Sequence, residues 1–382
     1  MILHDLRKNR TAILPDSGRD LLRSEVSLAL GRLGFTVLRP RPEDLADEKH
    51  EHYLPRLIEK KPELFFSINL QGLFPGAPHT RSLLEAGIPT LAWFVDNPWH
   101  LLSAMRDPSW KNLHLALTDK SFVEPLQAAG AGSVMHMPLA ASAAHMREAG
   151  NAPEKLGGIV FAGRSSFPNL ESFFAGQELP EESMSRALEV QKHGERADFA
   201  WWVRELGLSE SQKHFWPGKK ARKPGKGAVL CNAAWRRACL QAAQTYAGGL
   251  SVFGDDGWQG LKDLRGPVDY YTRLPAAYRA ARYSLNINSL LLPQGLSQRV
   301  FDAWMAGGFC LSDWNQGLEI FPPELVREIA FHSPEEIPSL AASLDANHNR
   351  REKLRRDWEA HILAEHSYEK RVGDTLFQLG LL

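Results

Sequence analysis

The segment 294–308 has the residue types of a phosphate site followed by a site for sugar hydroxyls. It follows a strand-like run at 283–289 and opens with Gly295 before an amphipathic helical pattern. In such a turn, backbone N–H groups and the positive end of the helix converge beside Arg299, which suits a diphosphate. Three residues later, the carboxylate of Asp302 can accept hydrogen bonds from a ribose diol. The spacing therefore predicts a site for a nucleotide sugar.

An ordinary structural turn is the alternative, because glycine-started turns between strand and helix are common in α/β proteins. Six further segments favour the site: YSLNI at 283–287, QRVFD at 298–302, AGGFCLSD at 306–313, GLEIF at 317–321, FHSPEE at 331–336 and AEHSYEKR at 364–371. Together they resemble the C-terminal domain of the CgeB-like glycosyltransferases. The first half resembles the family more loosely, at 89–100, 117–124 and 136–140.

This resemblance implies an α/β chain with the GT-B fold, in which two facing Rossmann-like domains have parallel sheets. The expected boundaries are 1–148 for the acceptor-side domain, 149–355 for the nucleotide-sugar domain, and 356–382 for a helix that crosses back to the first domain. The implied activity is transfer of a sugar to a hydroxyl of a glycan, a surface polymer or a protein such as flagellin. The nucleotide sugar would be a co-substrate, with no cofactor.

The composition limits the other classes of function. The 382 residues include 45 basic and 45 acidic side chains, and the pI is about 7.3, so no global field favours nucleic acid or an anionic membrane. Three cysteines without a CxxC pair predict a reducing compartment and thiols that fill the core. Without a signal-peptide pattern or an apolar run of 18 residues, we expect a soluble cytoplasmic protein and no integral membrane segment.

Apolar runs alternate with helical patterns in both halves, which predicts parallel sheets covered by helices. In the first half we expect strands at 11–14, 35–38, 64–69, 90–95, 113–117 and 133–137. After a linker at 140–158, we expect strands at 158–162, 250–253, 268–271, 283–287, 309–312 and 329–331. Residues 176–245 read as mostly helical, with a basic run at 219–226 that is typical of a solvated loop.

Ligands of open α/β sheets lie beyond the carboxyl ends of the strands, so the loops there supply the candidate donor residues. Gly163, Arg164 and Ser165 offer N–H groups, a guanidinium and a hydroxyl, although an ordinary hydrophilic turn is an equal alternative. In the fold that the chain resembles, the base lies near Tyr271. The full donor set is Gly163, Arg164, Ser165, Tyr271, Asn288, Gln294, Gly295, Ser297, Gln298, Arg299 and Asp302.

Three details of this set stay open at the level of sequence. Asn286 and Asn288 alternate along a strand, so only one should face the site, with a slight preference for Asn288. Related retaining enzymes often carry two glutamates eight positions apart, where this chain has Gln294 and Asp302, so the stereochemical outcome is undecided. The chain has no Asp-x-Asp motif, and we predict no metal site. The cluster Trp235-Arg-Arg237 is typical of side chains that pack between helices or lie on the surface of the protein.

On the acceptor side, a strand pattern ends in Asp96-Asn97-Pro-Trp-His100. A carboxylate or imidazole at the carboxyl end of a strand can take the proton of an acceptor hydroxyl, so Asp96 is the first candidate base and His100 the second. The alternative is that Asp96 caps a turn or the next helix. Asn69, after the preceding strand, and Asn97 would line the acceptor side.

Two rival functions remain. One is a non-catalytic member of the family that still binds nucleotide sugars, for which Gln294 in place of glutamate is the only hint. The other is a sugar-nucleotide epimerase or a phosphorylase on the same fold.

Overall fold

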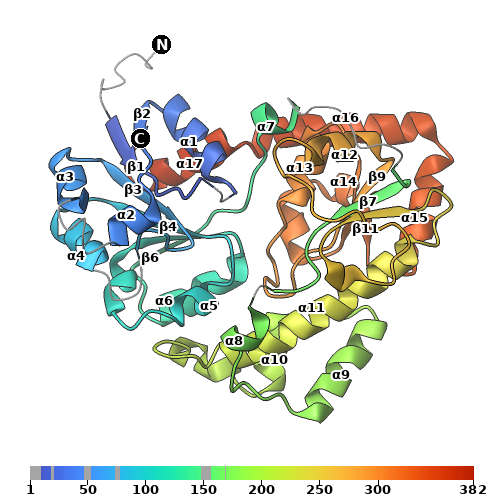
Figure 1. Ribbon diagram of the computed structural model, residues 1–382, viewed down its shortest axis with the longest axis horizontal. Coiled ribbons are helices and arrows are strands. Elements are labelled where there is room, and N and C mark those ends of the chain that lie inside the picture. Colours follow the sequence, from blue (N-terminus) through green and yellow to red (C-terminus); the bar gives the residue numbers. More distant parts are fainter. Residues whose placement is uncertain (1–9, 19–20, 47–52, 74–77, 148–155, 168) are drawn as a thin grey trace. The chain divides into compact units, whose positions relative to one another are not determined.

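The computed structural model describes residues 10–18, 21–46, 53–73, 78–147, 156–167 and 169–382, and the chain divides into two compact units (Figure 1). The N-terminal unit combines the residues up to Pro138 with Glu210–Ala221 and Tyr368–Leu382. The C-terminal unit comprises Leu139–Ser209 and Arg222–Ser367. Each unit is built around its own parallel sheet.

In the described residues, the N-terminal sheet has the strand order β2-β1-β3-β4-β5-β6, and every pairing is parallel. Its strands are β1 (Arg10–Ile13), β2 (Phe35–Leu38), β3 (Leu64–Ile68), β4 (Thr90–Phe94), β5 (His114–Leu117) and β6 (Ser133–His136). Every residue of β3 and β4 is buried, because helices cover both faces of a parallel sheet. The six strands expected in this half are confirmed.

The helices of this unit up to β6 are α1 (Arg23–Arg32), α2 (Pro42–Ala46), α3 (Tyr53–Glu59), α4 (Pro78–Glu85), α5 (Pro98–Leu102) and α6 (Val123–Ala128). Short 3-10 helices cover Pro108–Asn112 and Lys120–Phe122. Within the described residues, no helix of the protein is both long enough and apolar enough to cross a membrane.

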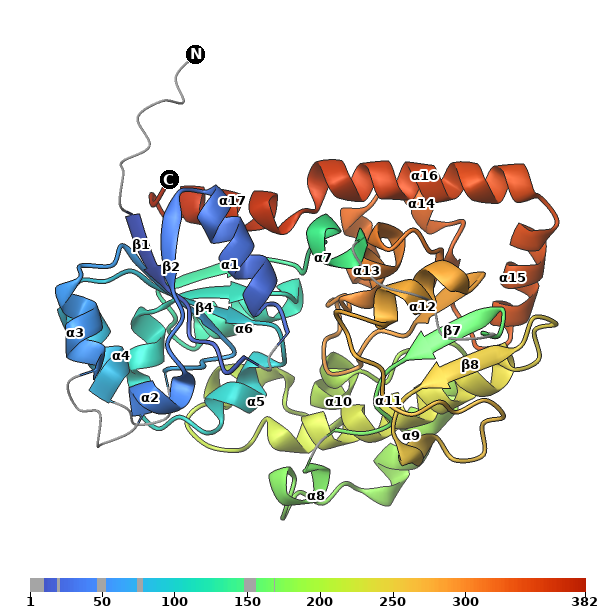
Figure 2. The ribbon, with the colours of Figure 1, turned by 45° about the horizontal axis from the view of Figure 1, so that its top comes forward.

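Two segments from later in the chain complete the N-terminal unit. Helix α17 (Tyr368–Gln378) packs along α1, as Figure 2 shows. Phe215 makes an edge-to-face contact with Trp99, with ring centroids 5.6 Å apart, and Trp216 does the same with Trp110 at 5.5 Å. The segment 209–214 that precedes these rings is a 3-10 helix. Parts of the chain far apart in sequence therefore share one core.

The C-terminal sheet is parallel throughout its described strands, with the order β11-β10-β9-β7-β8. These strands are β7 (Ile159–Ala162), β8 (Leu250–Phe253), β9 (Tyr283–Asn286), β10 (Cys310–Asp313) and β11 (Ala330–Phe331). The sheet extends from β7 in both directions, with β8 on one side of β7 and β9 on the other. The loops that follow the adjacent strands β7 and β9 therefore diverge at the carboxyl ends of these strands. That is the place where doubly wound sheets bind their ligands.

The strand expected at 268–271 is not present. Oδ1 of Asp269 accepts hydrogen bonds from the backbone N–H groups of Tyr271 (3.1 Å) and Thr272 (2.7 Å). An aspartate that binds the backbone two and three residues ahead forms a turn, and those N–H groups are then lost to a strand ladder. The segment instead leads into the next helix.

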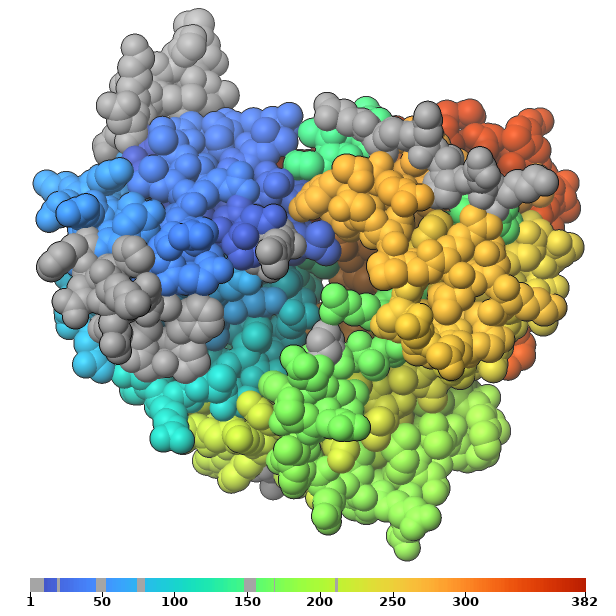
Figure 3. Space-filling model, in the orientation of Figure 1, coloured from blue at the N-terminus to red at the C-terminus, as the bar shows by residue number. Residues whose placement is uncertain are grey.

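The helices of the C-terminal unit are α7 (Ala143–Arg147), α8 (Leu170–Phe173), α9 (Glu181–Lys192), α10 (Phe199–Glu205), α11 (Arg222–Ala243), α12 (Leu274–Ala280), α13 (Arg299–Met305), α14 (Pro323–Val326), α15 (Glu336–Asp345) and α16 (His348–Glu365). Two 3-10 helices span Asp256–Trp258 and Gln316–Ile320. Residues between β7 and α11, green to yellow, form much of this unit's surface in Figure 3.

Two expectations for loops were wrong in part. The linker expected at 140–158 contains α7 in its described part, and residues 148–155 lie outside the described residues. The basic run at 219–226 is a loop only at its start, because α11 begins at Arg222 with Pro224 in its first turn, where the missing N–H costs nothing. Nζ of Lys226 donates to the carbonyl of Gln177 over 2.6 Å.

Helix α13 is fixed by an aromatic stack. The rings of Trp304 in α13 and Trp358 in α16 lie 5.1 Å apart with an interplanar angle of 3°, and both side chains are fully buried. Phe309 contacts Trp304 from the start of β10 at 4.8 Å. Burying two indole rings is a large hydrophobic contribution. The stack therefore packs the C-terminal part of α13 against α16.

Candidate functional site

Arg299 is the first residue of α13, and its side chain turns back onto the sheet. Nε donates to the carbonyl oxygen of Ala162 over 2.8 Å, and Nη1 donates to Oδ1 of Asn286 over 3.0 Å. The guanidinium also lies over the ring of Phe161, 5.1 Å from its centroid. These contacts hold one positive charge at the carboxyl ends of β7 and β9.

A second guanidinium lies close to it. Arg236 in α11 donates from Nη1 to the carbonyl of Arg164 over 3.3 Å. Burial, together with the positive charge of Arg299, lowers the pKa of Arg236 to about 10, while Asp313 acts in the opposite direction. In the described part of the chain, neither Arg236 nor Arg299 forms an ion pair with a carboxylate. Two guanidiniums beside each other, neither in an ion pair in the described residues, suit an anion.

The loop after β7 supports these cations and leaves few backbone donors for a ligand. The N–H of Gly163 donates to the carbonyl of Phe253 (2.9 Å), and the N–H of Ser165 donates to Asp255 (3.1 Å). A Cβ at Gly163 would lie 3.1 Å from Nη2 of Arg299, so glycine leaves room for the guanidinium. Arg164 has an exposed side chain. Of the donors expected here, its guanidinium is the accessible charged group.

The two asparagines near the end of β9 do not alternate as expected. Asn286 and Asn288 are both fully buried, and Nδ2 of Asn286 donates to Oδ1 of Asn288 over 3.1 Å. In an extended chain, side chains two residues apart lie on the same face, so the expectation that only one asparagine would face the site was wrong. Asn288 donates to Oδ1 of Asp313 over 2.8 Å and accepts from the N–H of Ser297 over 3.0 Å. In this structure both asparagines hold loops in place.

The turn before α13 is also bonded within the protein. Gly295 accepts a hydrogen bond at its carbonyl from Asn315 (2.8 Å), and the hydroxyl of Ser297 donates to Oδ1 of Asn286. Nε2 of Gln298 donates both to the carbonyl of Ala140 (2.7 Å) and to Oδ1 of Asp302 (2.8 Å). With the N–H of Ser297 also occupied, Arg299 is the charged group that this turn presents.

Asp302, expected to meet a ribose, is only 1% exposed. Its Oδ2 accepts the hydroxyl of Tyr270 over 2.6 Å, while Gln298 occupies Oδ1. A diol therefore reaches this carboxylate only if those hydrogen bonds rearrange. Tyr271 packs against Tyr270 (4.8 Å) and against His145 of α7 (5.4 Å).

Gln294 differs from the other candidate donor residues, none of which lines the same pocket. Its Nε2 donates to Oε1 of Gln316 over 2.9 Å, and it lines a pocket of about 440 Å³ beside the loops after β9, β10 and β11. The other donor candidates gather around the carboxyl ends of β7 and β9. Gln294 thus stands beside a separate cavity of the same unit.

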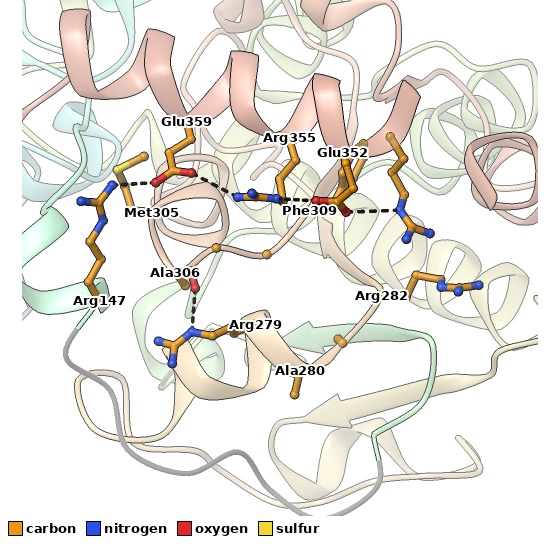
Figure 4. A pocket seen from close by; sticks show the side chains of 14 residues that line it. Arg147, Arg279, Ala280, Arg282, Met305, Ala306, Phe309, Glu352, Arg355 and Glu359 are labelled. Carbon is orange, nitrogen blue, oxygen red and sulfur yellow. Dashed lines mark hydrogen bonds and ion pairs between the residues drawn. The ribbon is translucent and has the colours of Figure 1, made fainter. Parts of the chain in front are cut away.

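A larger pocket, of about 620 Å³, lies at the opposite end of α13 (Figure 4). Its arginines are largely neutralised by a chain of ion pairs: Glu359 joins Arg355 (3.1 Å) to Arg147 (2.6 Å), and Glu352 pairs with Arg355 at 3.2 Å. Arg279 donates from Nε to the carbonyl of Ala306 over 3.0 Å. This pocket is lined by none of the candidate donor residues.

In the N-terminal unit, Asn69 and Asp96 come together beyond β3 and β4. Nδ2 of Asn69 donates to Oδ2 of Asp96 over 2.7 Å, and Oδ1 of Asn69 accepts the N–H of Val95 over 2.9 Å. Asn69 has a φ of 52°, a left-handed conformation that asparagine tolerates well. Loss of solvation raises the pKa of Asp96, and the hydrogen bond from Asn69 acts in the opposite direction. Because Asp96 is an exposed residue, water screens much of this shift.

The helix after Asp96 is capped by its neighbour. Oδ1 of Asn97 accepts hydrogen bonds from the N–H groups of Trp99 (3.0 Å) and His100 (3.3 Å). The alternative reading, in which Asp96 caps this helix, is therefore wrong. Asn97 and His100 are 2% and 7% exposed, so Asp96 is the accessible member of the segment.

Within the described residues, no three His, Cys, Asp or Glu side chains gather closely enough to hold a metal ion. The three cysteines are all buried.

Residues 234–376 match a family model described as glycosyl transferase-like. This part of the chain is glycosyltransferase-like. The match includes Arg236, Arg299 and Asp302, whereas the loop at Gly163 lies outside it. No curated protein matches this chain in sequence.

Solved structures give the fold. HepE from Anabaena, crystallised with UDP-glucose, is similar over 97% of this chain and 100% of its own, with 8% identity and a TM-score of 0.50. The apo structure of OtsA has 10% identity, coverage of 96% and 98%, and a TM-score of 0.47. A glycosyltransferase from Rickettsia africae has 11% identity, coverage of 97% for both chains, and a TM-score of 0.46. With two parallel α/β sheets, the chain has the GT-B fold.

Proposed function

We propose that this protein is a glycosyltransferase that moves a sugar from a nucleotide-diphosphate donor to a hydroxyl acceptor. One observation carries the proposal: Arg299 and Arg236 stand together, without carboxylate partners in the described residues, at the carboxyl ends of the strands of a glycosyltransferase-like region. A diphosphate is the anion that such a pair of guanidiniums fits, because each can donate two parallel hydrogen bonds.

The guanidiniums would do electrostatic work during transfer. As the bond between the sugar and the diphosphate breaks, negative charge grows on the departing phosphate oxygen, and fixed cations stabilise it without having to reorganise. Arg299 is suited to this because Ala162, Asn286 and Phe161 hold its side chain from three directions. Metal independence is part of the proposal, since these side chains supply the positive charge.

We assign the acceptor proton to Asp96. Its carboxylate is exposed and oriented by Asn69, and a raised pKa makes a carboxylate a better proton acceptor. The finer assignment, a CgeB-like enzyme of the cytoplasm, rests on the sequence motifs at 283–287, 298–302 and 364–371. Because HepE was crystallised with UDP-glucose, UDP-sugars are the first donors to test.

The experiment is a thermal-shift panel of UDP-, GDP-, dTDP- and CMP-sugars on the wild type and on Arg299→Ala. We expect one nucleotide class to raise the Tm of the wild type and to have no such effect on the variant. Arg186→Ala is the matched control, because Arg186 is a half-exposed arginine of α9 that pairs with Glu205. An equal shift in Arg299→Ala would place the diphosphate elsewhere.

A non-catalytic nucleotide-sugar binder is the second candidate, and Gln294 favours it. Where related retaining enzymes often carry a negative charge near the sugar, this chain has a neutral carboxamide that is hydrogen-bonded to Gln316. Isothermal titration with the donor found in the panel, followed by an assay for release of the free nucleotide with and without acceptors, separates the two. Binding without turnover for any acceptor would favour the second candidate.

A further inference from the structure

An exposed tryptophan stands between two pockets at the edge of the C-terminal sheet. Trp314 follows β10 and His332 follows β11, and the backbone N–H of Trp314 donates to the carbonyl of Phe331 over 2.8 Å. Because the strands are paired, the two rings meet, with centroids 5.7 Å apart and an interplanar angle of 24°. Trp314 is 39% exposed. The sheet itself thus holds an aromatic surface open to solvent.

The pockets on the two sides differ in chemistry but share both rings. The first, about 440 Å³, has a mixed lining, in which Gln294, Gln316 and Arg196 stand beside Trp235. The second, about 410 Å³, is mainly apolar and includes Leu318, Phe321 and Val326. Trp314 and His332 line both. We call the two pockets and the rings between them the Trp314 groove.

These chemistries together match a carbohydrate. A sugar ring has one face of C–H groups, which packs on an aromatic ring, and a rim of hydroxyls, which both donate and accept hydrogen bonds. A carboxamide is the side chain that offers donors and an acceptor at once, and Gln294 and Gln316 supply two of them, joined over 2.9 Å. A groove with an aromatic surface between two pockets suits more than one ring.

The groove is connected to the donor site through a buried network. Nη1 of Arg196, which lines the first pocket, donates to Oδ2 of Asp313 over 2.7 Å, and Oδ1 of Asp313 accepts from Asn288. Asn288 in turn holds Ser297, two residues before Arg299. Gln294 belongs to the same loop. A ligand in the groove would therefore lie beside the loop that leads to Arg299, one of the two arginines proposed to bind the diphosphate.

We propose that the Trp314 groove binds an oligosaccharide, and that the acceptor is therefore a glycan chain. The second statement rests on the proposed function, whereas binding of an oligosaccharide can be tested without it. The ring of Trp314 contacts the C–H face of one sugar, and Gln294 and Gln316 contact its hydroxyls. The apolar pocket takes the next ring along the chain.

The test uses the full chain, fluorescently labelled, on a microarray of printed oligosaccharides, followed by titration calorimetry with the free oligosaccharide that binds best. We expect Trp314→Ala to bind it about tenfold more weakly, equivalent to about 1.4 kcal/mol. The substitution should leave the fold intact, because the hydrogen bonds of Trp314 to the sheet come from its backbone. Gln316→Ala is a second variant that should weaken binding, and Trp314→Phe should restore part of it.

Leu188→Ala is the matched control, since Leu188 is a similarly exposed apolar residue (37%) on α9, outside both pockets. The proposal is overturned if the wild type binds no oligosaccharide on the array, or if Trp314→Ala and Gln316→Ala both bind as the wild type does. Arg299→Ala should keep oligosaccharide binding while it loses the donor. Loss of donor binding and loss of glycan binding are thus separate results, and failure of one proposal is not mistaken for failure of the other.

Discussion

The hydroxyl of Tyr270 lies 2.6 Å from Oδ2 of Asp302 and donates to it. This bond ties the turn before α12 to the first turn of α13, directly behind Arg299. Because Asp302 is 1% exposed, its charge depends on the hydroxyl and on the amide of Gln298 for stabilisation. The carboxylate that the sequence suggests for a ribose thus also fixes the position of the helix.

Tyr270→Phe should destabilise the C-terminal unit by about 1–3 kcal/mol, because a buried carboxylate loses a hydrogen bond. Urea denaturation of the wild type and the variant measures this. A double-mutant cycle with Asp302→Asn isolates the pair, and we expect the double variant to lose less than the sum of the two single variants. Additive losses would mean that the hydroxyl and the carboxylate do not interact.

Arg236→Gln should weaken binding of the nucleotide sugar by about tenfold or more, since it removes one of two charge-assisted hydrogen-bond donors. Titration calorimetry with the donor identified by thermal shift measures the loss. The control is Arg237→Gln, because that neighbour binds the carbonyls of Gly257 and Gln259 instead. If both variants bind the donor equally, Arg236 does not belong to the site.

Asp313→Ala should destabilise the protein by about 3–5 kcal/mol, because it leaves the charge of Arg196 buried and unpaired. Asp313 is fully buried, and the Arg196 side chain is only 13% exposed. Chemical denaturation measures the effect. The double variant Asp313→Ala/Arg196→Met should recover part of the lost stability, since it removes the stranded charge. If the double variant is no more stable than Asp313→Ala, the loss of stability comes from the hydrogen bonds that Asp313 makes with Asn288.

Asp96→Asn should lower kcat by a factor of about 10²–10⁴, the usual contribution of a general base, with little change in donor affinity. The base acts when ionised, so the wild-type rate should rise with pH through the pKa of Asp96, which loss of solvation raises. This acidic limb should be absent from the pH profile of the variant. A profile that keeps the limb would point to another base.

The three cysteines should not react with a thiol reagent such as DTNB in the native protein at pH 8. Burial raises the pKa of Cys231 to about 11 and that of Cys310 to about 12, and it raises the pKa of Cys239 well above its ordinary value. All three thiols should react together when guanidinium unfolds the chain, because the thiolate is the reactive form and access is then restored. A thiol that reacts in the native state would contradict this burial.

The sheets were predictable from the sequence because their strands are continuous apolar runs. Leu64-Phe-Phe-Ser-Ile68 is buried at every position, and the expected and observed strands agree there to within one residue. At 268–271, by contrast, β-branched and aromatic residues indicated a strand, but Asp269 captures the backbone N–H groups and forms a turn. A single side-chain hydrogen-bond acceptor overrode the local propensity.

The site was harder to predict, because its polar residues take their roles from partners distant in sequence. Arg236 reads as one of several surface charges, and only the packing of α11 brings it beside Arg299. The expectation that Asn286 and Asn288 would face opposite sides was wrong, because residues two apart in an extended chain share a face, and the two amides are hydrogen-bonded to each other. Arg299 was identified correctly as a charge at a strand-to-helix turn, since that motif is local in the sequence.

Helix α17 packs on α1, about the whole length of the chain away in sequence. A ribosome releases α1 before α17, so the side of α1 that α17 covers stays exposed while the intervening residues are synthesised. During that time, the exposed side of α1 is a surface on which chaperones can act and nascent chains can associate. Contacts that close so long a loop also slow folding. The unit that contains α1 is therefore complete only after α17 has been made.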